Sequence, residues 1–501
     1  MPTTLPTISA SDNSVIDEVL VLGFALDKKS KKFSILSGEL RVDQGPLLQA
    51  LTDLGASGAS DEVIKLPGSA SKLILLTALN LKADGSIAHE VLRRAAGAAA
   101  RSLAGTTSAT FALPQASKQD FQAIAEGALL GAYTFDEFRG SSKADRKPPL
   151  KKITIYTKKA KDKSFLQAIK RAEIIAKYTH LTRDLINTPP SHLTPDSFSL
   201  RFKKLAASLG VKVEILNETQ LIKGGYGGII GVGQGSANPP RLLRLSYSGK
   251  GAKKRYAFIG KGITFDTGGL ALKPAQGMEA MKSDMSGAAA VCAAVLAIAE
   301  LKLPINVDAW AALAENMVSD KATRPSDIIT IYGGKTVEVL NPDAEGRLVL
   351  ADAMVRAAEV GKKAGGLDGM VDVATLTGAQ VVALGTRTSA VMTNNESFRE
   401  QFLTLAEITG EAFWPMPLPE ELRASLDSPV ADMANIGDRM GGMLVAGLFL
   451  KDFVDSELPW LHLDIAGPAY NEAKAHGYTP VGGTGVALRT LVALAESSAA
   501  K

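Results

Sequence analysis

The stretch that decides the fold runs from Arg255 to Leu313 and is typical of a strand, a helix and a second strand. It begins with Arg255-Tyr-Ala-Phe-Ile-Gly260 and ends with Val307-Asp-Ala-Trp-Ala-Ala-Leu313, two apolar runs of strand length. Between them, residues 286–301 are mostly small and apolar and predict a helix, for which Ser286 is a plausible N-cap. Two strands joined through a helix predict parallel pairing in a covered sheet.

The same alternation continues toward the C-terminus. A helix is expected over 346–360, and further strands are expected over 370–374, 390–393 and 461–465. Strands that alternate with helices indicate the α/β class, with a mainly parallel central sheet flanked by helices. In such sheets the functional site lies at the carboxyl ends of the strands.

The N-terminal third is predicted to form a separate α/β unit. Apolar runs at 19–22 and 73–76 predict strands, and residues 89–104 predict an Ala- and Arg-rich helix. The polar, Lys-rich segment 138–163 is typical of an exposed connection, with an anion-binding patch as the alternative. A helix is then expected from Ser164 to Leu185, ending near Pro189-Pro190. The predicted organisation is a smaller α/β domain, a linker helix and a larger C-terminal α/β domain, with the bounds 1–165, 166–190 and 191–501.

Composition excludes several classes of protein. The 501 residues are 46% apolar and carry 56 basic and 52 acidic side chains, so the net charge is only +4. That balance gives no strong reason to expect nucleic acid or an anionic membrane as the main partner. Cys292 is the single cysteine, which excludes an intramolecular disulfide. No signal-peptide pattern or stretch approaching about 18–20 apolar residues stands out, so we expect a cytoplasmic protein without membrane spans.

Three segments of the C-terminal domain carry the candidate chemistry. They are Gly260-Lys-Gly-Ile-Thr-Phe-Asp-Thr-Gly-Gly-Leu-Ala-Leu-Lys273, Met281-Lys-Ser-Asp-Met-Ser-Gly287 and Asn341-Pro-Asp-Ala-Glu-Gly-Arg347. Together they offer four carboxylates, at Asp266, Asp284, Asp343 and Glu345. Clustered carboxylates raise one another's pKa unless cations lie among them. Two divalent ions would balance four such charges, and paired metal ions are a standard hydrolytic device.

The neighbouring residues fit a metal site, although each acid alone is more often a turn or cap residue. Gly268-Gly269 permits a tight backbone path directly after Asp266. No histidine lies between His192 and His462, so oxygen ligands favour Mn²⁺ or Mg²⁺, with carboxylate-bound Zn²⁺ as an alternative. Lys273 and Arg347 are cations that could stabilise the oxyanion of a tetrahedral intermediate.

At these segments the sequence resembles the leucyl (cytosol) aminopeptidase family, peptidase family M17. The stretch Asn341-Pro-Asp-Ala-Glu-Gly-Arg-Leu348 is similar to the signature of that family, and residues 260–273 are similar to its first metal-binding loop. The resemblance continues to residue 495 and covers essentially all of 180–495. It implies a catalytic C-terminal domain preceded by a divergent, non-catalytic, macro-like α/β domain.

The resemblance also implies a role for each matching residue. The metal ligands would be Lys261, Asp266, Asp284, Asp343 and Glu345, with Lys261 binding as a neutral amine and with Asp266 and Glu345 as candidates to bridge two ions. The catalytic pair would be Lys273, which polarises the carbonyl, and Arg347, which holds a bicarbonate that serves as general base. The apolar side-chain pocket would involve Met281, Thr375 and Gly378, although ordinary core packing is an alternative for Met281.

The implied activity is the release of N-terminal residues, Leu among them, from unblocked peptides. The implied cofactors are two divalent ions per subunit, Mn²⁺ or Zn²⁺ with Mg²⁺ or Co²⁺ as alternatives, and the implied assembly is a hexamer of two stacked trimers. The sequence departs from the family at Pro342, where Thr is commoner, and at Thr267, where Ser is frequent. Neither departure removes a ligand.

Three other functions compete with this one. The glycine-rich residues 224–235 suggest a dinucleotide site, but Ser236 occupies the place of the last glycine in the required spacing. The Lys-rich residues 143–163 are the only hint of the DNA-binding or regulatory role that some bacterial members of the family have. An inactive structural homologue is disfavoured because all seven metal and catalytic positions are intact.

Overall fold

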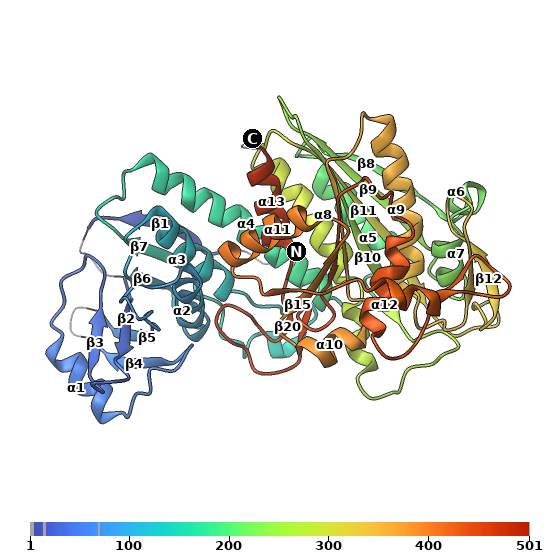
Figure 1. The fold of residues 1–501 in the computed structure, drawn as a ribbon. Helices are drawn as coiled ribbons and strands as arrows, with labels where there is room; N and C mark the ends of the chain where they lie inside the picture. Colours follow the sequence, from blue (N-terminus) through green and yellow to red (C-terminus); the bar gives the residue numbers. More distant parts are fainter. Residues whose placement is uncertain (1–4, 14–16, 69–70, 500–501) are drawn as a thin grey trace. The chain divides into compact units, whose positions relative to one another are not determined.

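The computed structural model describes residues 5–13, 17–68 and 71–499 (Figure 1). These residues form two compact units. The N-terminal unit comprises Met1–Leu181 and Glu472–Val481, and the C-terminal unit comprises Thr182–Asn471 and Gly482–Lys501. Helix α4 (Lys163–Asn187) runs through the division between them.

A seven-stranded sheet organises the N-terminal unit. Its strands follow the order β1-β7-β6-β2-β5-β4, with β3 paired to β2, and neighbours from β1 to β5 along this path are parallel. Helices α2 and α3 pack against each other. The bounds are β1 (Thr7–Ser11), β2 (Val19–Leu26), β3 (Phe33–Leu36), α1 (Gly45–Asp53), β4 (Val63–Pro67), β5 (Leu73–Ala78), α2 (His89–Ser102), β6 (Ser108–Ala112), α3 (Lys118–Gly131), η1 (Ser141–Lys143) and β7 (Lys152–Tyr156).

An eight-stranded sheet organises the C-terminal unit, in the order β16-β15-β18-β14-β10-β11-β9-β8. Its four central strands, from β18 to β11, are parallel, whereas β8, β9 and β15 join it with antiparallel pairings. The α/β class with a mainly parallel sheet is therefore confirmed. The bounds are β8 (Lys212–Leu216), β9 (Arg241–Ser248), β10 (Arg255–Asp266), β11 (Asn306–Asn316), β14 (Gly369–Ala374), β15 (Ser389–Thr393), β16 (Phe413–Pro415) and β18 (Trp460–Asp464).

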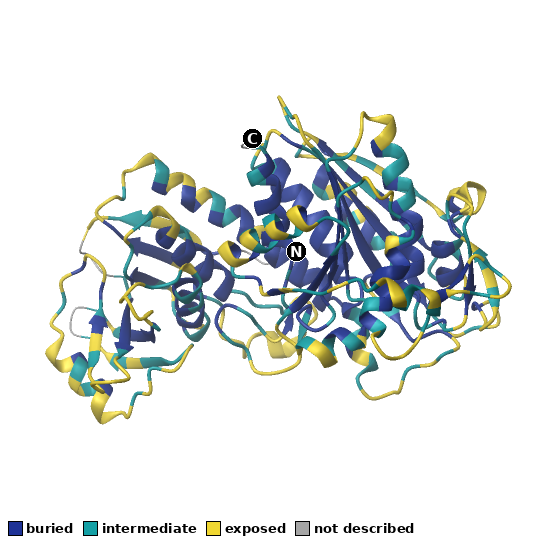
Figure 2. Ribbon diagram, in the orientation of Figure 1, coloured by how far each residue is buried: buried dark blue, intermediate teal, exposed yellow. Residues whose placement is uncertain are grey.

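Helices cover both faces of this sheet, and the strands between them are buried (Figures 1 and 2). One face is packed by α8 together with α11 and α13, and the other by α7, α9 and α12. The bounds are α5 (Pro195–Ala206), α6 (Glu218–Gly224), α7 (Gly227–Gly233), η2 (Met278–Ser283), α8 (Ser286–Glu300), α9 (Gly346–Lys363), α10 (Gly378–Leu384), α11 (Glu396–Thr409), η3 (Glu420–Leu426), α12 (Gly442–Lys451) and α13 (Leu488–Ala499). Two small sheets complete the unit, β12 (Asp327–Thr330), β13 (Thr336–Val339) and β17 (Met433–Ala434), and β19 (Tyr470–Asn471) with β20 (Gly482–Gly483).

The small residues of α8 have a packing reason. A Cβ added at Gly260 of β10 would lie 2.4 Å from the Cα of Ala288, and one added at Gly287 would lie 1.9 Å from the carbonyl oxygen of Val373. Real Cβ atoms do not approach so closely, so glycine at both positions lets the helix and sheet backbones touch.

Several expectations about elements were wrong. Strand β10 continues past Gly260 to Asp266, so the first chemistry-bearing segment begins inside a strand. Ser286 does not cap α8, because Met285 holds the N-cap position and the Ser286 hydroxyl donates to the carbonyl of Ser283. The segment 138–163 is not only an exposed connection, since it contains β7, whose last four residues are buried in the N-terminal sheet.

The expectation about apolar length was also wrong. Among the described residues, one helical stretch, Met278–Glu300, is long and apolar enough to cross a membrane by length and composition. Because 94% of its apolar window is buried inside the protein, the stretch is the core helix α8 with the η2 turn before it.

Candidate metal and catalytic site

The candidate site lies at the carboxyl ends of the central parallel strands. Asp266 is the last residue of β10, Asn316 is the last residue of β11, and the two are register partners. Asp464 ends β18, beside Ala374 at the end of β14. A single edge of the sheet therefore collects polar side chains from three of its four central strands, as expected for this class of fold.

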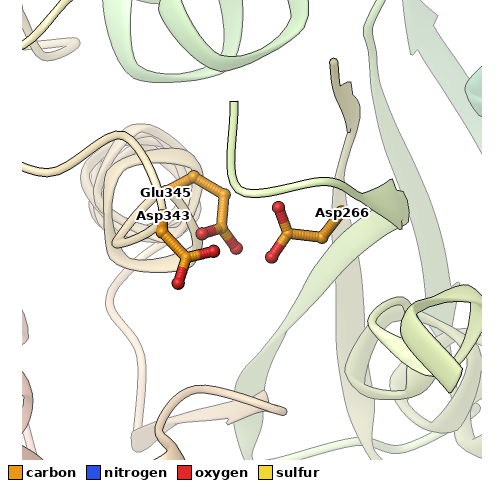
Figure 3. Close-up of side chains that lie close together, drawn as sticks. All are labelled: Asp266, Asp343 and Glu345. Carbon is orange, nitrogen blue, oxygen red and sulfur yellow. The ribbon is translucent and has the colours of Figure 1, made fainter. Parts of the chain in front are cut away.

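Three carboxylates face one another at this edge (Figure 3). One oxygen each of Asp266, Asp343 and Glu345 lies within 4.8 Å of the others, close enough to hold one metal ion. Asp266 comes from the strand end, whereas Asp343 and Glu345 come from the segment that leads into α9. Asp266 and Glu345 are each only 2% exposed, so water screens their charges little.

Lys261 connects this group to the fourth carboxylate. Its ammonium lies 2.8 Å from Asp284 Oδ1 and 2.8 Å from Glu345 Oε1, and it donates to the carbonyl of Thr375 (2.8 Å). The Asp284 and Glu345 oxygens therefore lie no farther apart than twice that distance. Lys261 is 3% exposed, so its ammonium lies inside the protein among these carboxylates.

Lys273 lies on the other side of the acidic cluster. Its ammonium pairs with Asp266 Oδ2 at 2.9 Å and with Asp343 Oδ1, and its backbone N–H donates to the carbonyl of Thr267 (2.9 Å). The turn that carries it needs Gly268, which has a φ of +85°, and a Cβ there would lie 2.9 Å from Asp343 Oδ1. The predicted tight path after Asp266 is thus confirmed.

Glycine is also required at the start of α9. A Cβ added at Gly346 would lie 2.6 Å from the Cε of Lys261 and 2.9 Å from its Nζ. The lysine chain lies directly against the first turn of the helix, in space that any other residue would fill.

Arg347 is buried, in the first turn of α9. One of its guanidinium nitrogens donates to the backbone carbonyl of Asn435 (2.8 Å), and the guanidinium lies 5.9 Å from the centre of the Phe449 ring. Its Nε is buried with no hydrogen-bond partner among the described residues, so it has a free donor. Burial lowers the pKa of Arg347 to about 10, although Glu345 and Asp464 oppose that change.

The electrostatics of the cluster are set by burial. Burial raises the pKa of Asp284, of Asp343 and of Glu345 above their ordinary values, with the charge of Asp266 adding to each rise. For Lys261, burial works to lower the pKa, but the charges of Asp284, Glu345 and Asp266 outweigh it and raise that pKa. The pKa of Lys273 is raised in the same way.

Two family models match the chain. The catalytic domain of the cytosol aminopeptidase family matches residues 180–492, and the N-terminal domain of that family matches residues 24–142. The chain belongs to the cytosol aminopeptidase family. This membership confirms the resemblance drawn from the three segments, and it makes the protein a peptidase of a metal-dependent family.

Named relatives agree over the full length. A probable cytosol aminopeptidase of Streptomyces avermitilis is 52% identical, and one of Streptomyces coelicolor is 50% identical, each covering 99% of both chains. Among solved structures, the bottromycin maturation enzyme BotP in complex with Mn has a TM-score of 0.84 and 36% identity, and the match covers 96% of this chain and 99% of that one.

Within this cytosol aminopeptidase fold, the loop after β14 borders the cluster. The Thr375 hydroxyl donates to Asp284 Oδ1 (2.7 Å), so this side chain contacts a candidate ligand and not only a pocket. Asp464 holds the loop, because it accepts from the Leu376 N–H (3.1 Å) and from the Thr377 hydroxyl (2.8 Å). Gly378 begins α10, and a Cβ there would meet open space. Met281 is half-buried in η2.

A second polar pair lies one layer below the strand ends. His462 of β18 and Asp372 of β14 are register partners, both fully buried, with His462 Nδ1 2.6 Å from Asp372 Oδ1. Trp460 donates to the other Asp372 oxygen (2.8 Å). Burial works to lower the pKa of His462, but Asp372 outweighs it and raises that pKa.

Two asparagines of the site carried no role in the sequence analysis. Asn316 donates to Asp266 Oδ1 (2.8 Å), and the Asn435 side chain accepts from the Leu340 and Asn341 N–H groups (2.9 and 3.2 Å) and donates to the Asn341 carbonyl (2.7 Å). Asparagine is common in turns, and these partners are 50 to 95 residues away. The position of Asn316 three residues after the end of the predicted strand 307–313 was the one available signal.

Proposed function

We propose that the protein is an aminopeptidase that removes the N-terminal residue, Leu and other mostly apolar residues, from unblocked peptides through two divalent metal ions. The observation that carries this proposal is the convergence of Asp266, Asp343 and Glu345 within 4.8 Å, joined through Lys261 to Asp284. Membership of the cytosol aminopeptidase family supports the reaction class.

The donor set fits two cations. We propose that Asp266, Asp343 and Glu345 surround one ion. We propose that Lys261 and Asp284 bind the other ion, together with the two bridging acids Asp266 and Glu345. Glu345 can bridge because it lies in the acidic cluster and also pairs with Lys261. Asp284 Oδ2 is buried with no hydrogen-bond partner among the described residues, and Glu345 Oε1, although paired with Lys261, accepts no hydrogen bond there. A buried carboxylate oxygen without a hydrogen bond is costly, and a metal ion would satisfy Asp284 Oδ2, which no ammonium meets.

When bound, paired ions supply a polarised water and Lewis acidity toward the scissile carbonyl. We propose Mn²⁺ or Zn²⁺, with Mg²⁺ or Co²⁺ as alternatives. Carboxylate oxygens beside one lysine amine suit these ions, and the similar solved structure of BotP is a complex with Mn. Lys261 must lose its proton to act as a ligand, since an ammonium has no lone pair.

The two remaining cations suit charge stabilisation. Lys273 reaches the acidic cluster from the turn after Asp266, and we propose that its ammonium stabilises the oxyanion that develops on the substrate carbonyl. Arg347 is held by Asn435 and has an unpaired Nε, and we propose that it binds bicarbonate as the general base. No histidine is among these groups.

Substrate selection follows from the same set. A free α-amino group is a ligand that a blocked peptide lacks, so we propose exopeptidase specificity. We propose Met281, Thr375 and Gly378 for the side-chain pocket, which the open space at Gly378 and the half-buried Met281 support.

The wider organisation is part of the proposal. We propose a catalytic domain over 191–501, a linker helix over 166–190, and a non-catalytic domain over 1–165. We also propose that the protein is a cytoplasmic hexamer. The cytoplasmic location is supported by relatives that are named cytosol aminopeptidases.

Assay of the purified protein tests the proposal. Leu-Gly-Gly should lose its N-terminal Leu, chelation should abolish release, and Mn²⁺ or Zn²⁺ should restore it. Metal analysis of the purified protein before chelation should find two ions per chain. Hydrolysis of N-acetyl-Leu-Gly-Gly at a comparable rate would rule the proposal out.

The Lys-rich segment 143–163 keeps a second candidate open, because its lysines are all exposed. Two of them pair with acids, Lys143 with Asp136 and Lys152 with Asp17. A duplex DNA shift that weakens with salt and disappears when these lysines are neutralised would support a DNA-binding role. The absence of any shift at low salt would remove it.

A further inference from the structure

Asn316 occupies an unusual place, because it joins two segments that carry proposed ligands. It is the last residue of β11, it is 5% exposed, and its register partner on β10 is Asp266. The segment around Asp343 and Glu345 approaches it from the other side, through Pro342.

The carboxamide uses its donors on both segments. Asn316 Nδ2 donates to Asp266 Oδ1 (2.8 Å) and to the carbonyl of Pro342 (3.2 Å). Pro342 has no N–H, so its carbonyl is the only backbone group through which it can be held. The backbone carbonyl of Asn316 also accepts from the N–H (3.0 Å) and the hydroxyl (2.9 Å) of Thr267, the residue after Asp266.

These bonds fix the rotation of the Asp266 carboxylate. Its Oδ1 accepts from Asn316 and from the Gly268 N–H, both at 2.8 Å, while its Oδ2 turns toward Lys273. Oδ1 is therefore occupied by hydrogen bonds from the protein, and Oδ2 is directed toward Lys273 and the acidic cluster. Groups that orient a metal ligand in this way commonly change metal affinity about 10–100-fold when they are removed.

We propose that Asn316 is a positioning residue, which orients Asp266 and fastens the Asn341–Arg347 segment at the distance needed to hold metal ions. This inference rests on the proposed metal site, but not on which peptides are cut. An amide is required, because both partners are acceptors. Leucine has no donor, and a carboxylate would present a third acceptor to them.

Two variants separate positioning from packing. Asn316→Ala removes the amide and leaves space, whereas Asn316→Leu removes the amide and keeps the volume, next to the apolar side chains of Val339 and Leu348 that share a cavity wall with Asn316. Asn306→Ala is the matched control, since Asn306 is the first residue of the same strand.

The measurement is titration of the chelator-treated full-length proteins with Mn²⁺, followed calorimetrically. Both Asn316 variants should bind Mn²⁺ about 10–100-fold more weakly than the wild type and the Asn306 control. At saturating Mn²⁺ they should recover most of kcat for Leu-Gly-Gly, with KM unchanged.

Wild-type Mn²⁺ affinity in both Asn316 variants would overturn the inference. Loss of the native circular dichroism in both would overturn it too, since Asn316 would then hold the fold and not orient a carboxylate. If the wild type binds Mn²⁺ but releases no Leu, the proposed function fails while the Asn316 result can still be read from affinity alone.

Discussion

The two units share an architecture but differ at the ends of their strands. In the N-terminal unit the parallel strands β5 and β6 run into the apolar residues Leu79 and Leu113, whereas β7 runs into Thr157 and β2 into the exposed Asp27. In the C-terminal unit the parallel strands end in or beside acids, amides and hydroxyls, namely Asp266, Asn316, Thr375 and Asp464. A parallel sheet supplies the edge, and the residues placed there decide whether that edge can do chemistry.

Buried charge follows the same division. In the N-terminal unit Glu126 lies between two arginines, with Arg93 Nε 3.1 Å and Arg171 Nη1 2.5 Å from its carboxylate oxygens. In the C-terminal unit, within the part of the chain that the structure describes, four carboxylates share only Lys261 and Lys273 as direct ion-pair partners. The protein's own cations compensate the charge in the first case, whereas two lysines do not balance four carboxylates in the second, which fits the metal ions proposed there.

The sharpest test of this comparison is Glu345→Ala. Turnover should fall by about 10³-fold or more, because the shared carboxylate supports a metal ion that contributes several kcal/mol at about 1.4 kcal/mol per tenfold. Metal content of the purified variant should fall in parallel. Glu400→Ala, an exposed acid on α11, is the control and should retain both. Full activity in the Glu345 variant would reject the ligand set.

The second test removes a buried acid from the other unit. Glu126→Ala leaves two arginines facing a lost carboxylate, and should destabilise the N-terminal unit by about 3–5 kcal/mol. Hydrogen exchange should accelerate over α2 and α3, while the Mn²⁺ affinity of the C-terminal site is unchanged. Asp53→Ala, at an exposed position of α1, should leave exchange as in the wild type. Weakened Mn²⁺ binding in the Glu126 variant would contradict the assignment of metal binding to the C-terminal unit alone.

The smallest effect concerns the pair below the site. The raised pKa of His462 means that its stabilisation is full below its unfolded pKa of about 6.5 and is lost as pH rises through the folded value. The groups whose charges act on it are Asp372, Asp464 and Arg347. His462→Gln should therefore lower the melting temperature more at pH 6 than at pH 10, with Mn²⁺ affinity retained. An equal loss at both pH values would show that His462 is uncharged in the fold.

Local patterns predicted the elements and the acids better than their supports. The run 255–260 and the helix 346–360 follow from side-chain periodicity, and the four carboxylates follow from their place after strands and turns. Strand β7 was missed because Lys151 and Lys152 precede four buried residues that are too few to outweigh a Lys-rich setting. The hydrogen bonds of Asn316 and Asn435 were not predicted, because contacts between residues 50 to 95 positions apart produce no periodic pattern in the sequence.

The proposed ligands are synthesised before the side chains that fix them in place, because Asn435 follows the Asn341–Arg347 segment in the sequence. A nascent chain that has been made as far as Arg347 already contains all five proposed ligands and both proposed catalytic cations. It still lacks Asn435 and Asp464, which hold the ligand segment and the 375–377 loop in place. The proposed site therefore gains all of these supports only when the chain has been made as far as Asp464.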